Sequence, residues 1–431
     1  MNKLFAGAAR VDISPEIGHN LDGWIDRRPA TRTATPILAR ALALSLESAQ
    51  MVIFSCDLLE IPGQLSEKIK SRIEDVCAIP VDHIFIFPTH NHFGPSVSGT
   101  YANADDITDQ EAAYIESLPA LFAGAASDAV ANLQPANMSI GYGEERTICH
   151  NSRFWRKDGA INWVGDREKL WAADSGPVNP RVSVLRFSDS MDQTIASIYN
   201  FSCHANSSED FEYSSISWDW VGYASQAIEN VFGGEALFLL APCGNIHPVQ
   251  EGVPREMGES IAGVVKEIWS RLDRLTPDQM SIHRTMLQLE ARDFNQYDSG
   301  EIEEFCAQLW DEETILSVQN IFMDVLQQRR MSDTNKYEFV IEVIILGKLA
   351  IVCVPGEFFV ELGLEIQCNS PFEHTLVVEA LSGSVGYIPT RKAYEEGGYQ
   401  PSVGARLVPG SGERIVEGAL ILLNRVKQQV G

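Results

Sequence analysis

The sequence lacks the long apolar runs that place a chain in a membrane. No stretch approaches the roughly 20 uncharged apolar residues that a membrane-spanning helix requires. The first 18 residues contain Arg10, Asp12 and Pro15 and have no sustained apolar core, so they do not have the pattern of a secretion signal. We therefore expect a cytoplasmic protein with no stable membrane insertion.

The sequence also has few basic residues relative to acidic ones. The 431 residues include 33 Lys and Arg against 59 Asp and Glu, which gives a formal net charge of −26. A chain so acidic repels the phosphate backbone of nucleic acids. No block of five or more like charges occurs, so the acidity is expected to be spread over a solvated surface. A small molecule is the expected partner, and the sequence predicts no particular oligomeric state.

Paired cysteines are absent as well. The eight cysteines are scattered singly, with no Cys-x-x-Cys pair. Cys56 and Cys353 lie in apolar runs, where cysteine behaves as a small buried hydrophobe. Free thiols in a reducing compartment are the expected state.

Short apolar segments alternate with helical patterns along the chain. The apolar, β-rich segments span residues 39–46, 50–56, 82–88, 181–187, 195–203, 235–243, 339–355 and 374–381, and the main helical patterns span 63–78, 111–133 and 220–232. Continuous apolar strands interleaved with helices indicate an α/β fold with buried sheets. Gly347-Lys348 interrupts one apolar segment as a hairpin would, so we expect mixed β-sheets flanked by helices.

No repeat, low-complexity tract or linker divides the chain, and we expect a single domain over residues 1–431. Residues 295–335 are predicted to form a polar helical segment inserted between strands. This segment is either an active-site lid or a solvated pair of helices. Residues 144–175 carry three tryptophans among Gly, Asp and Arg. Their length and composition predict a long functional loop.

Candidate metal ligands follow three apolar segments. His90 and His92 come directly after the strand that ends at Pro88, His204 follows a second apolar run, and Glu357 follows a third through a Pro-Gly turn. In an extended backbone, residues i and i+2 share a face, so His90 and His92 are expected to project together. A carboxylate beside a buried strand requires a partner. Taken singly, each of these residues has an ordinary structural explanation, as a loop or hydrogen-bonded histidine or as a salt-bridged glutamate.

Taken together, two histidines and one carboxylate suit zinc and leave a position open for water or substrate. Bound zinc polarises a carbonyl group and lowers the pKa of a water molecule to about 7. The chemistry predicted from these residues is therefore hydrolysis.

Several segments, in chain order, resemble motifs of the neutral/alkaline ceramidase family. AARVDISPEIGHNLDGW (8–24) resembles the family's opening D-I-T-P stretch, and THNHFGP (89–95) resembles its T-H-T-H-S-G-P motif. FSCHANSS (201–208) resembles the family's V-H-G-T-S motif, and WDWVGYA (218–224) resembles its G-D-N-K-G-Y-A motif. CVPGEF (353–358) resembles the I-P-G-E-F motif, and GYIPTRKAYEEGGY (386–399) resembles the H-Y-I-T-T-Y-E-E-Y motif. The resemblance extends from residue 8 to about residue 400 and implies the fold of that family's catalytic domain.

The resemblance also implies roles for individual residues. It assigns one zinc ion to His90, His204, Glu357 and Tyr387, and an acid/base or oxyanion role to His92. Tyr394 and Tyr399 match tyrosines near the substrate carbonyl, and Arg153 roughly matches an active-site arginine. Gly23 and Asp57 match positions that contact the substrate or support the ligands.

Two departures from the family limit what the resemblance implies. Ala241 stands at or near a serine once proposed as the family's nucleophile, which leaves a metal-activated water as the attacking group. The immunoglobulin-like C-terminal domain of full-length ceramidases has no counterpart here. We therefore expect a zinc-dependent hydrolase of a small amide or N-acylated amine. Three alternatives stay open: an esterase, lactonase or cyclic-amide hydrolase on the same site, a thiol hydrolase built on Cys243 and His247, and a non-catalytic binding protein.

Overall fold

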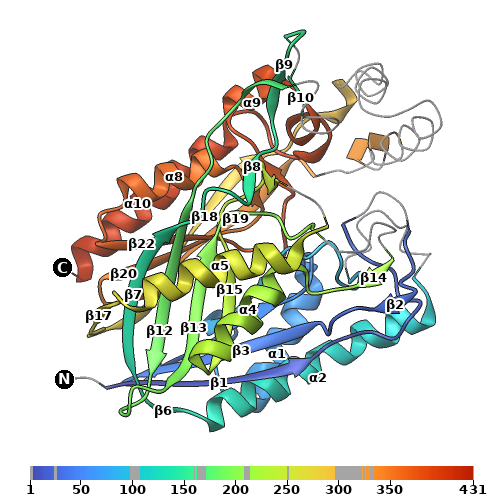
Figure 1. The fold of residues 1–431 in the computed structure, drawn as a ribbon. Helices are drawn as coiled ribbons and strands as arrows, with labels where there is room; N and C mark the ends of the chain where they lie inside the picture. The colour runs from blue at the N-terminus through green and yellow to red at the C-terminus, as the bar shows by residue number, and fades with distance from the viewer. Residues whose placement is uncertain are drawn as a thin grey trace.

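The structure, a computed structural model, describes residues 3–23, 27–97, 107–159, 161–162, 171–207, 214–249, 252–296, 323, 326–327, 329–330 and 334–430. Three β-sheets with helices on their outer faces make up most of it (Figure 1). This arrangement confirms the predicted α/β fold with mixed sheets. The helical excursion predicted for 295–335 lies mostly outside the described residues. None of the described helices is long and apolar enough to cross a membrane.

The first sheet has the strand order β5-β4-β3-β1-β6. Its strands are β1 (Leu4–Asp12), β3 (Leu38–Leu46), β4 (Ala49–Cys56), β5 (Ile84–Pro88) and β6 (Gln134–Pro135), and only β4 and β5 are parallel. Helices α1 (Gly63–Cys77) and α2 (Asp109–Ala131) cover one face and share an apolar cluster with it. Helix α1 buries Leu65, Ile69 and Ile73, spaced as the inner face of an amphipathic helix requires. A capping box between Thr108 and Glu111 begins α2.

The second sheet has the order β15-β13-β12-β7-β17. Its strands are β7 (Asn137–Glu144), β12 (Arg181–Ser188), β13 (Thr194–Phe201), β15 (Glu235–Leu240) and β17 (Asp273–Leu275). Helix α4 (Asp219–Phe232) connects β13 to its parallel neighbour β15, and α5 (Pro254–Trp269) follows β15. Both helices pack on the same face of this sheet through one apolar cluster (Figure 1).

The third sheet has the order β18-β19-β20-β22. Its strands are β18 (Met280–Glu290), β19 (Lys336–Leu346), β20 (Leu349–Val354) and β22 (His374–Glu379), and α8 (Val360–Asn369) and α10 (Ser411–Val430) cover its outer face. Strands β19 and β20 form the predicted hairpin: Leu346 pairs with Leu349, and Gly347 turns the chain with φ of 58°. Glycine adopts such a positive φ without steric cost.

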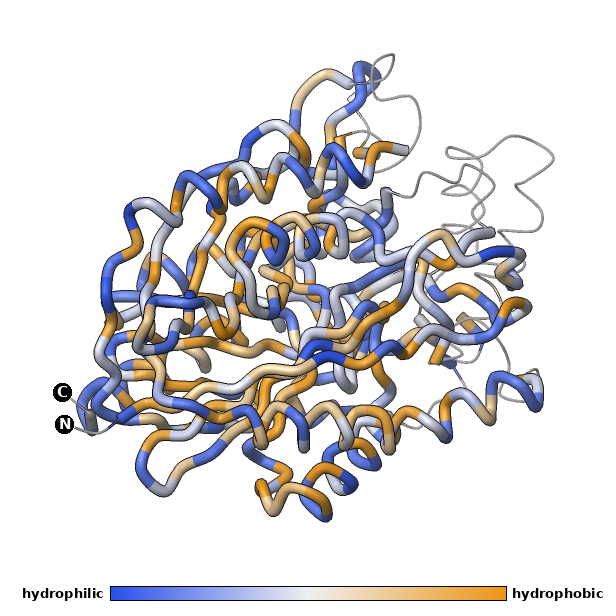
Figure 2. Tube along the Cα trace, turned by 60° about the horizontal axis from the view of Figure 1, so that its bottom comes forward, coloured by the Kyte–Doolittle hydropathy of each residue, from blue (hydrophilic) through white to orange (hydrophobic). Residues whose placement is uncertain are grey.

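The inner faces of the three sheets meet in one central core. Leu44 and Phe87 from the first sheet, Leu185 from the second and Ile351 from the third belong to the same buried cluster. Figure 2 shows apolar stretches concentrated along the inner strands, whereas the outer helices alternate between polar and apolar residues. The sheets thus converge, and their strand ends lie close to one another.

Short elements complete the fold. Paired short strands are β2 (Arg32–Thr33) with β14 (Ser215–Ile216), β8 (Cys149–Asn151) with β16 (Ile246–Pro248), β9 (Phe154–Arg156) with β10 (Ile161–Asn162) and β11 (Trp171–Asp174), and β21 (Glu357–Phe358) with β23 (Tyr387–Ile388); single helical turns are η1 (Val81–His83), η3 (Phe294–Gln296), α9 (Arg391–Glu396) and η4 (Gln400–Gly404). Residues 144–175 therefore contain strands β8 to β11, and the prediction of one long loop there is wrong. Seven cysteines are described, and all seven are free, as predicted for them.

Candidate metal centre

Each large sheet contributes one candidate ligand just beyond the carboxyl end of a strand. His90 follows β5, His204 follows β13 and Glu357 follows β20. Backbone contacts hold the first two loops together, because Asn91 bridges Ala205 and the His92 amide donates to the Ala205 carbonyl at 3.0 Å. The strand ends of three separate sheets thus meet at one point.

The candidate ligand atoms lie at separations that suit one shared cation. Glu357 Oε2 is 3.5 Å from His90 Nε2 and 3.6 Å from His204 Nε2. Ring nitrogens of His90, His92 and His204 all lie within 4.8 Å of one another. Atoms held about 2.1 Å from a tetrahedral zinc are about 3.4 Å apart. His90, His92 and His204 therefore form a group that could hold a metal ion, with Glu357 against two of them.

Hydrogen bonds at Nδ1 fix the ring orientations of His90 and His204. His90 Nδ1 donates to the Leu59 carbonyl at 3.3 Å, and His204 Nδ1 donates to the Ile246 carbonyl at 3.0 Å. With the proton on Nδ1, the lone pair is on Nε2 and points to the centre. Both Nε2 atoms and Glu357 Oε2 are buried and have no hydrogen-bond partner among the described residues. Buried acceptors rarely stay unsatisfied, so this donor set fits a divalent cation.

The same geometry sets the electrostatics of the centre. Burial raises the pKa of Glu357, but His204 and His90 outweigh that effect and hold the pKa below its ordinary value. Burial lowers the pKa of His204, and Glu357 opposes this only in part. Glu357 and His204 thus have the protonation states in which they bind metal. At His90, Glu357 outweighs the opposing effect of burial and raises the pKa above its ordinary value.

His90 reaches the centre through a strained backbone. Its φ is 61°, in the left-handed region that non-glycine residues seldom adopt. Asn91 holds the turn, since its side-chain amide donates to the carbonyls of Asp57 at 3.1 Å and Ser217 at 2.7 Å. The assumption of an extended His90–His92 segment is therefore wrong. The two rings nevertheless lie 4.9 Å apart, because the turn brings them together.

Gly23 supports the second histidine of the pair. His92 Nδ1 donates to the Gly23 carbonyl at 3.3 Å. Gly23 has φ of 80°, and a Cβ atom there would lie only 2.4 Å from His92 Nδ1. Burial, followed by the electrostatic effect of the His90 and His204 imidazoles, lowers the pKa of His92 well below its ordinary value. His92 is therefore a neutral imidazole whose Nε2 can accept a proton.

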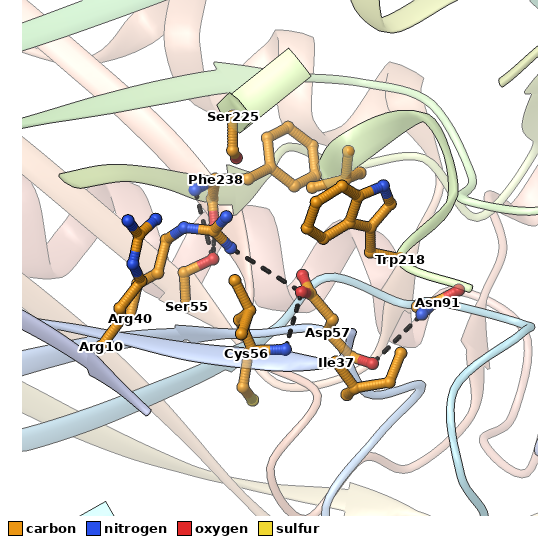
Figure 3. A network of polar contacts seen from close by, with 12 residues as sticks. Arg10, Ile37, Arg40, Ser55, Cys56, Asp57, Asn91, Trp218, Ser225 and Phe238 are labelled. Atoms are coloured by element: carbon orange, nitrogen blue, oxygen red, sulfur yellow. Dashed lines mark hydrogen bonds and ion pairs between the residues drawn. The ribbon is translucent and has the colours of Figure 1, made fainter. Parts of the chain in front are cut away.

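Asp57 lies beside Asn91, whose side-chain amide donates to the Asp57 carbonyl (Figure 3). Its carboxylate accepts from the Leu38 amide at 3.0 Å and lies 3.7 Å from Arg40 Nη1, and both side chains are buried. Arg40 also pairs with Glu229 on α4 at 2.9 Å. Asp57 thus supports the His90 turn and does not reach the candidate ligands through any described contact.

Replacement of Asp57 with asparagine should change how stability depends on pH. Burial raises the pKa of Asp57 to about 6, although Arg40 opposes this shift. An unfolded aspartate titrates near pH 4, so between about pH 4 and 6 the folded chain binds the extra proton and its stability falls as pH rises. Asparagine does not ionise. From pH 4 to pH 7, the variant's free energy of unfolding should therefore gain about 2–3 kcal/mol relative to the wild type. Urea unfolding of both proteins at the two pH values measures this change, and a pH-independent difference would contradict it.

Tyr387 and Tyr399 border a cavity that opens beside Glu357. Glu357 and Tyr387 are paired residues of β21 and β23, and both line this cavity of about 510 Å³. Tyr399 lines it too, with its ring 5.8 Å from that of Tyr387 in an edge-to-face arrangement. The structure thus brings both tyrosines to the cavity that Glu357 lines.

Arg153 and Tyr394 have partners elsewhere. Arg153 is buried, forms an ion pair with Glu396 at 3.1 Å and lies over the ring of Phe359. The hydroxyl of Tyr394 donates to the Leu407 carbonyl at 2.7 Å. Neither residue is among the described lining of the cavity. Their roles in catalysis stay predictions that rest on the resemblance.

The fold resembles that of two solved enzymes over the whole chain. One is the neutral ceramidase from Pseudomonas aeruginosa, with a TM-score of 0.76, 16% sequence identity and coverage of 100% of this chain and 75% of that one. The chain has a ceramidase-like fold. The other is a ceramidase complexed with C2, with a TM-score of 0.72, 16% identity and coverage of 100% and 76%. No protein-family model matches the sequence, and no curated protein matches it significantly.

His247 lies beside the candidate ligands, a position that the sequence did not reveal. Its ring stacks on that of His204 at 4.4 Å. The Asn206 amide donates to His247 Nδ1 at 3.4 Å, which leaves the ring proton on Nε2. His247 lies within the short strand β16, so it lacks the pattern of a polar residue placed directly after a long apolar strand.

Glu379 and Cys243 lie behind the centre. Glu379 is fully buried and accepts from the amides of Cys243 at 2.7 Å and Phe358 at 2.9 Å, which joins two loops of the site. Burial raises the pKa of Cys243 well above its ordinary value, and its thiol lies 3.5 Å from His204 Nδ1. A buried thiol with a raised pKa is a poor nucleophile. This geometry disfavours a thiol hydrolase built on Cys243 and His247.

Proposed function

We propose that this protein is a zinc-dependent hydrolase that cleaves the amide bond of a small N-acylated amine. One observation carries the proposal: the buried Nε2 atoms of His90 and His204 and Oε2 of Glu357 converge without hydrogen-bond partners among the described residues. The fold of proteins named ceramidases supports the choice of an amide substrate. The cavity beside the centre has the size of a small-ligand site.

His90, His204 and Glu357 would hold the metal, with Tyr387 as the fourth ligand implied by the resemblance. A zinc ion bound there supplies Lewis-acid polarisation of the carbonyl and lowers the pKa of a water molecule. Deprotonated Glu357 and neutral His204 are in the states that such binding requires.

The remaining chemistry belongs to the side chains around the ligands. His92 carries its own proton on Nδ1, bonded to Gly23, so Nε2 accepts a proton from the attacking water and passes it to the departing amine. Tyr399, from the cavity wall, and His247, through its Nε2–H, can donate to the carbonyl oxygen as negative charge develops on it. Tyr394 holds the Leu407 carbonyl instead, so we assign the tyrosine donor to Tyr399.

A panel of amides and esters tests the reaction class. Acyl groups from acetyl to long-chain N-acyl-sphingosine would be offered to protein loaded with zinc and to a chelated sample, and amine and acid release would be measured. We expect chelator-sensitive cleavage of amides that returns on addition of zinc. Cleavage of esters or lactones alone would change the substrate class but keep the centre. Amide cleavage that the chelator does not inhibit would overturn the proposal.

A further inference from the structure

The helical turn that follows Tyr399 has an unusual backbone. The turn η4 (Gln400–Gly404) is a π-helix, a wide form that is rare and often lies at functional sites. Tyr399 lines the cavity at the start of this turn, and Gly404 lines it at the end. Gln400 is fully buried, and its side-chain amide donates to the Ser152 hydroxyl at 3.3 Å. The turn is thus anchored in the protein interior while both of its ends border the cavity.

Contacts with other segments fix the end of this turn. Arg292 Nη1 donates to the Ser402 carbonyl at 3.1 Å. Ala405, directly after the turn, forms backbone bridges with Gly386 and Tyr387. The end of the turn is therefore held beside the strand that carries Tyr387.

Gly404 lies directly against the ring of Tyr387. A Cβ atom on Gly404 would lie 2.3 Å from Tyr387 Cδ2 and 3.0 Å from Cε2, and its three nearest atoms all belong to Tyr387. Carbon atoms in contact are about 3.5–4.0 Å apart, so any side chain here would push the ring by about 1 Å or more. Gly404 is not among the glycines with positive φ. The ring that fills the space of a side chain, and not the backbone conformation, therefore calls for glycine at this position.

The position of Tyr387 matters because of its neighbour Glu357. The two are register partners on β23 and β21, and register partners project to the same side of a sheet. Both line the cavity. The Tyr399 ring meets the Tyr387 ring edge to face at 5.8 Å. The two residues at the ends of one π-helical turn, Tyr399 and Gly404, thus both adjoin the tyrosine that stands beside a candidate metal ligand.

We propose that Gly404 is a positioning residue for Tyr387: because it has no side chain, the ring can lie where its hydroxyl reaches the metal centre. The inference rests on the proposed function, since it takes Tyr387 as the fourth ligand beside His90, His204 and Glu357. A larger residue at position 404 should move the hydroxyl of Tyr387 and leave the other three ligands in place.

Zinc titration by calorimetry, in a double-mutant cycle of Gly404→Ala and Tyr387→Phe, tests this role. Groups that support a metal site typically contribute about tenfold to a hundredfold to metal affinity, so Gly404→Ala should weaken zinc binding by about that factor. Tyr387→Phe should weaken it at least as much. The double variant should bind zinc within about twofold of Tyr387→Phe, because the displaced ring no longer carries the hydroxyl. A general loosening of the site would instead weaken binding further in the double variant.

Gly263→Ala is the control for the exchange of glycine for alanine. Gly263 is exposed on α5, also lacks a positive φ, and no atom of the described residues outside its own helical backbone lies within 4 Å of a Cβ atom built there. This variant should keep the wild-type zinc affinity. If Gly404→Ala does not fold, addition of Tyr387→Ala should restore folding, because it removes the ring that the new methyl group meets.

The possible results separate this inference from the proposed reaction. Zinc affinities that follow the cycle support the role of Gly404 even if no amide is cleaved, in which case only the proposed reaction fails. Wild-type zinc affinity in Gly404→Ala, an equal further loss in the double variant, or failure of Tyr387→Ala to restore folding would overturn the inference. Absence of zinc binding by the wild type would overturn both.

Discussion

Replacing His204 with alanine should eliminate metal binding and lower amide hydrolysis by at least about a thousandfold, which corresponds to about 4 kcal/mol of transition-state stabilisation. His204 is completely buried, and its Nε2 lies 3.6 Å from Glu357 Oε2. Alanine removes one of the proposed ligands, and the candidate ligands His90, His204 and Glu357 come from three different sheets. Metal content by elemental analysis and kcat/KM for an N-acyl amide measure the two effects.

His283→Ala is the matched control for that experiment. His283 lies on β18, where its ring is 3.0 Å from the Ser281 hydroxyl, and it does not line the candidate centre. This variant should keep both its metal and its activity. If His204→Ala retained a full complement of metal and wild-type turnover, the assignment of His204 as a ligand would be wrong.

The second large effect is expected at Gly23. An alanine Cβ at this position would lie 2.4 Å from His92 Nδ1 and 2.9 Å from His92 Cγ, so the imidazole must move. The metal ligands are untouched, and metal content should stay at its wild-type level. Because displacement of a catalytic group by about 1 Å costs about a hundredfold in rate, kcat should fall by about that factor.

Gly159→Ala separates the clash from backbone strain. Gly159 has φ of 87°, close to the 80° of Gly23, but no atom of the described residues lies within 4 Å of a Cβ atom built there. Both substitutions impose the strain of a positive φ on alanine. Only Gly23→Ala should lower kcat, and an equal loss in both variants would show that strain, not the position of His92, limits activity.

The candidate ligands could be picked out in the sequence because each one follows a strongly apolar strand. Burial of β5, β13 and β20 is determined by their composition, and polar residues at the ends of such strands gather at one edge of a sheet. That three separate sheets would bring their ends together was not predictable, since it depends on packing around the shared core. The conformation of His90 was predicted incorrectly, because a local pattern does not show that Asn91 ties the turn to Asp57 and Ser217.

Other parts of the site depend on contacts between residues far apart in the chain. Gly23 and His92 meet across 69 positions. The role of Arg153 stays a prediction, and its ion pair with Glu396 is a contact that the motif does not specify.

Zinc titration into metal-free protein, followed by calorimetry, tests the central claim most directly. If the buried atoms of His90, His204 and Glu357 form a metal centre, the wild type should bind one ion per chain and His204→Ala should bind none at that site. Absence of zinc binding by the wild type, or identical binding by the variant, would contradict the account.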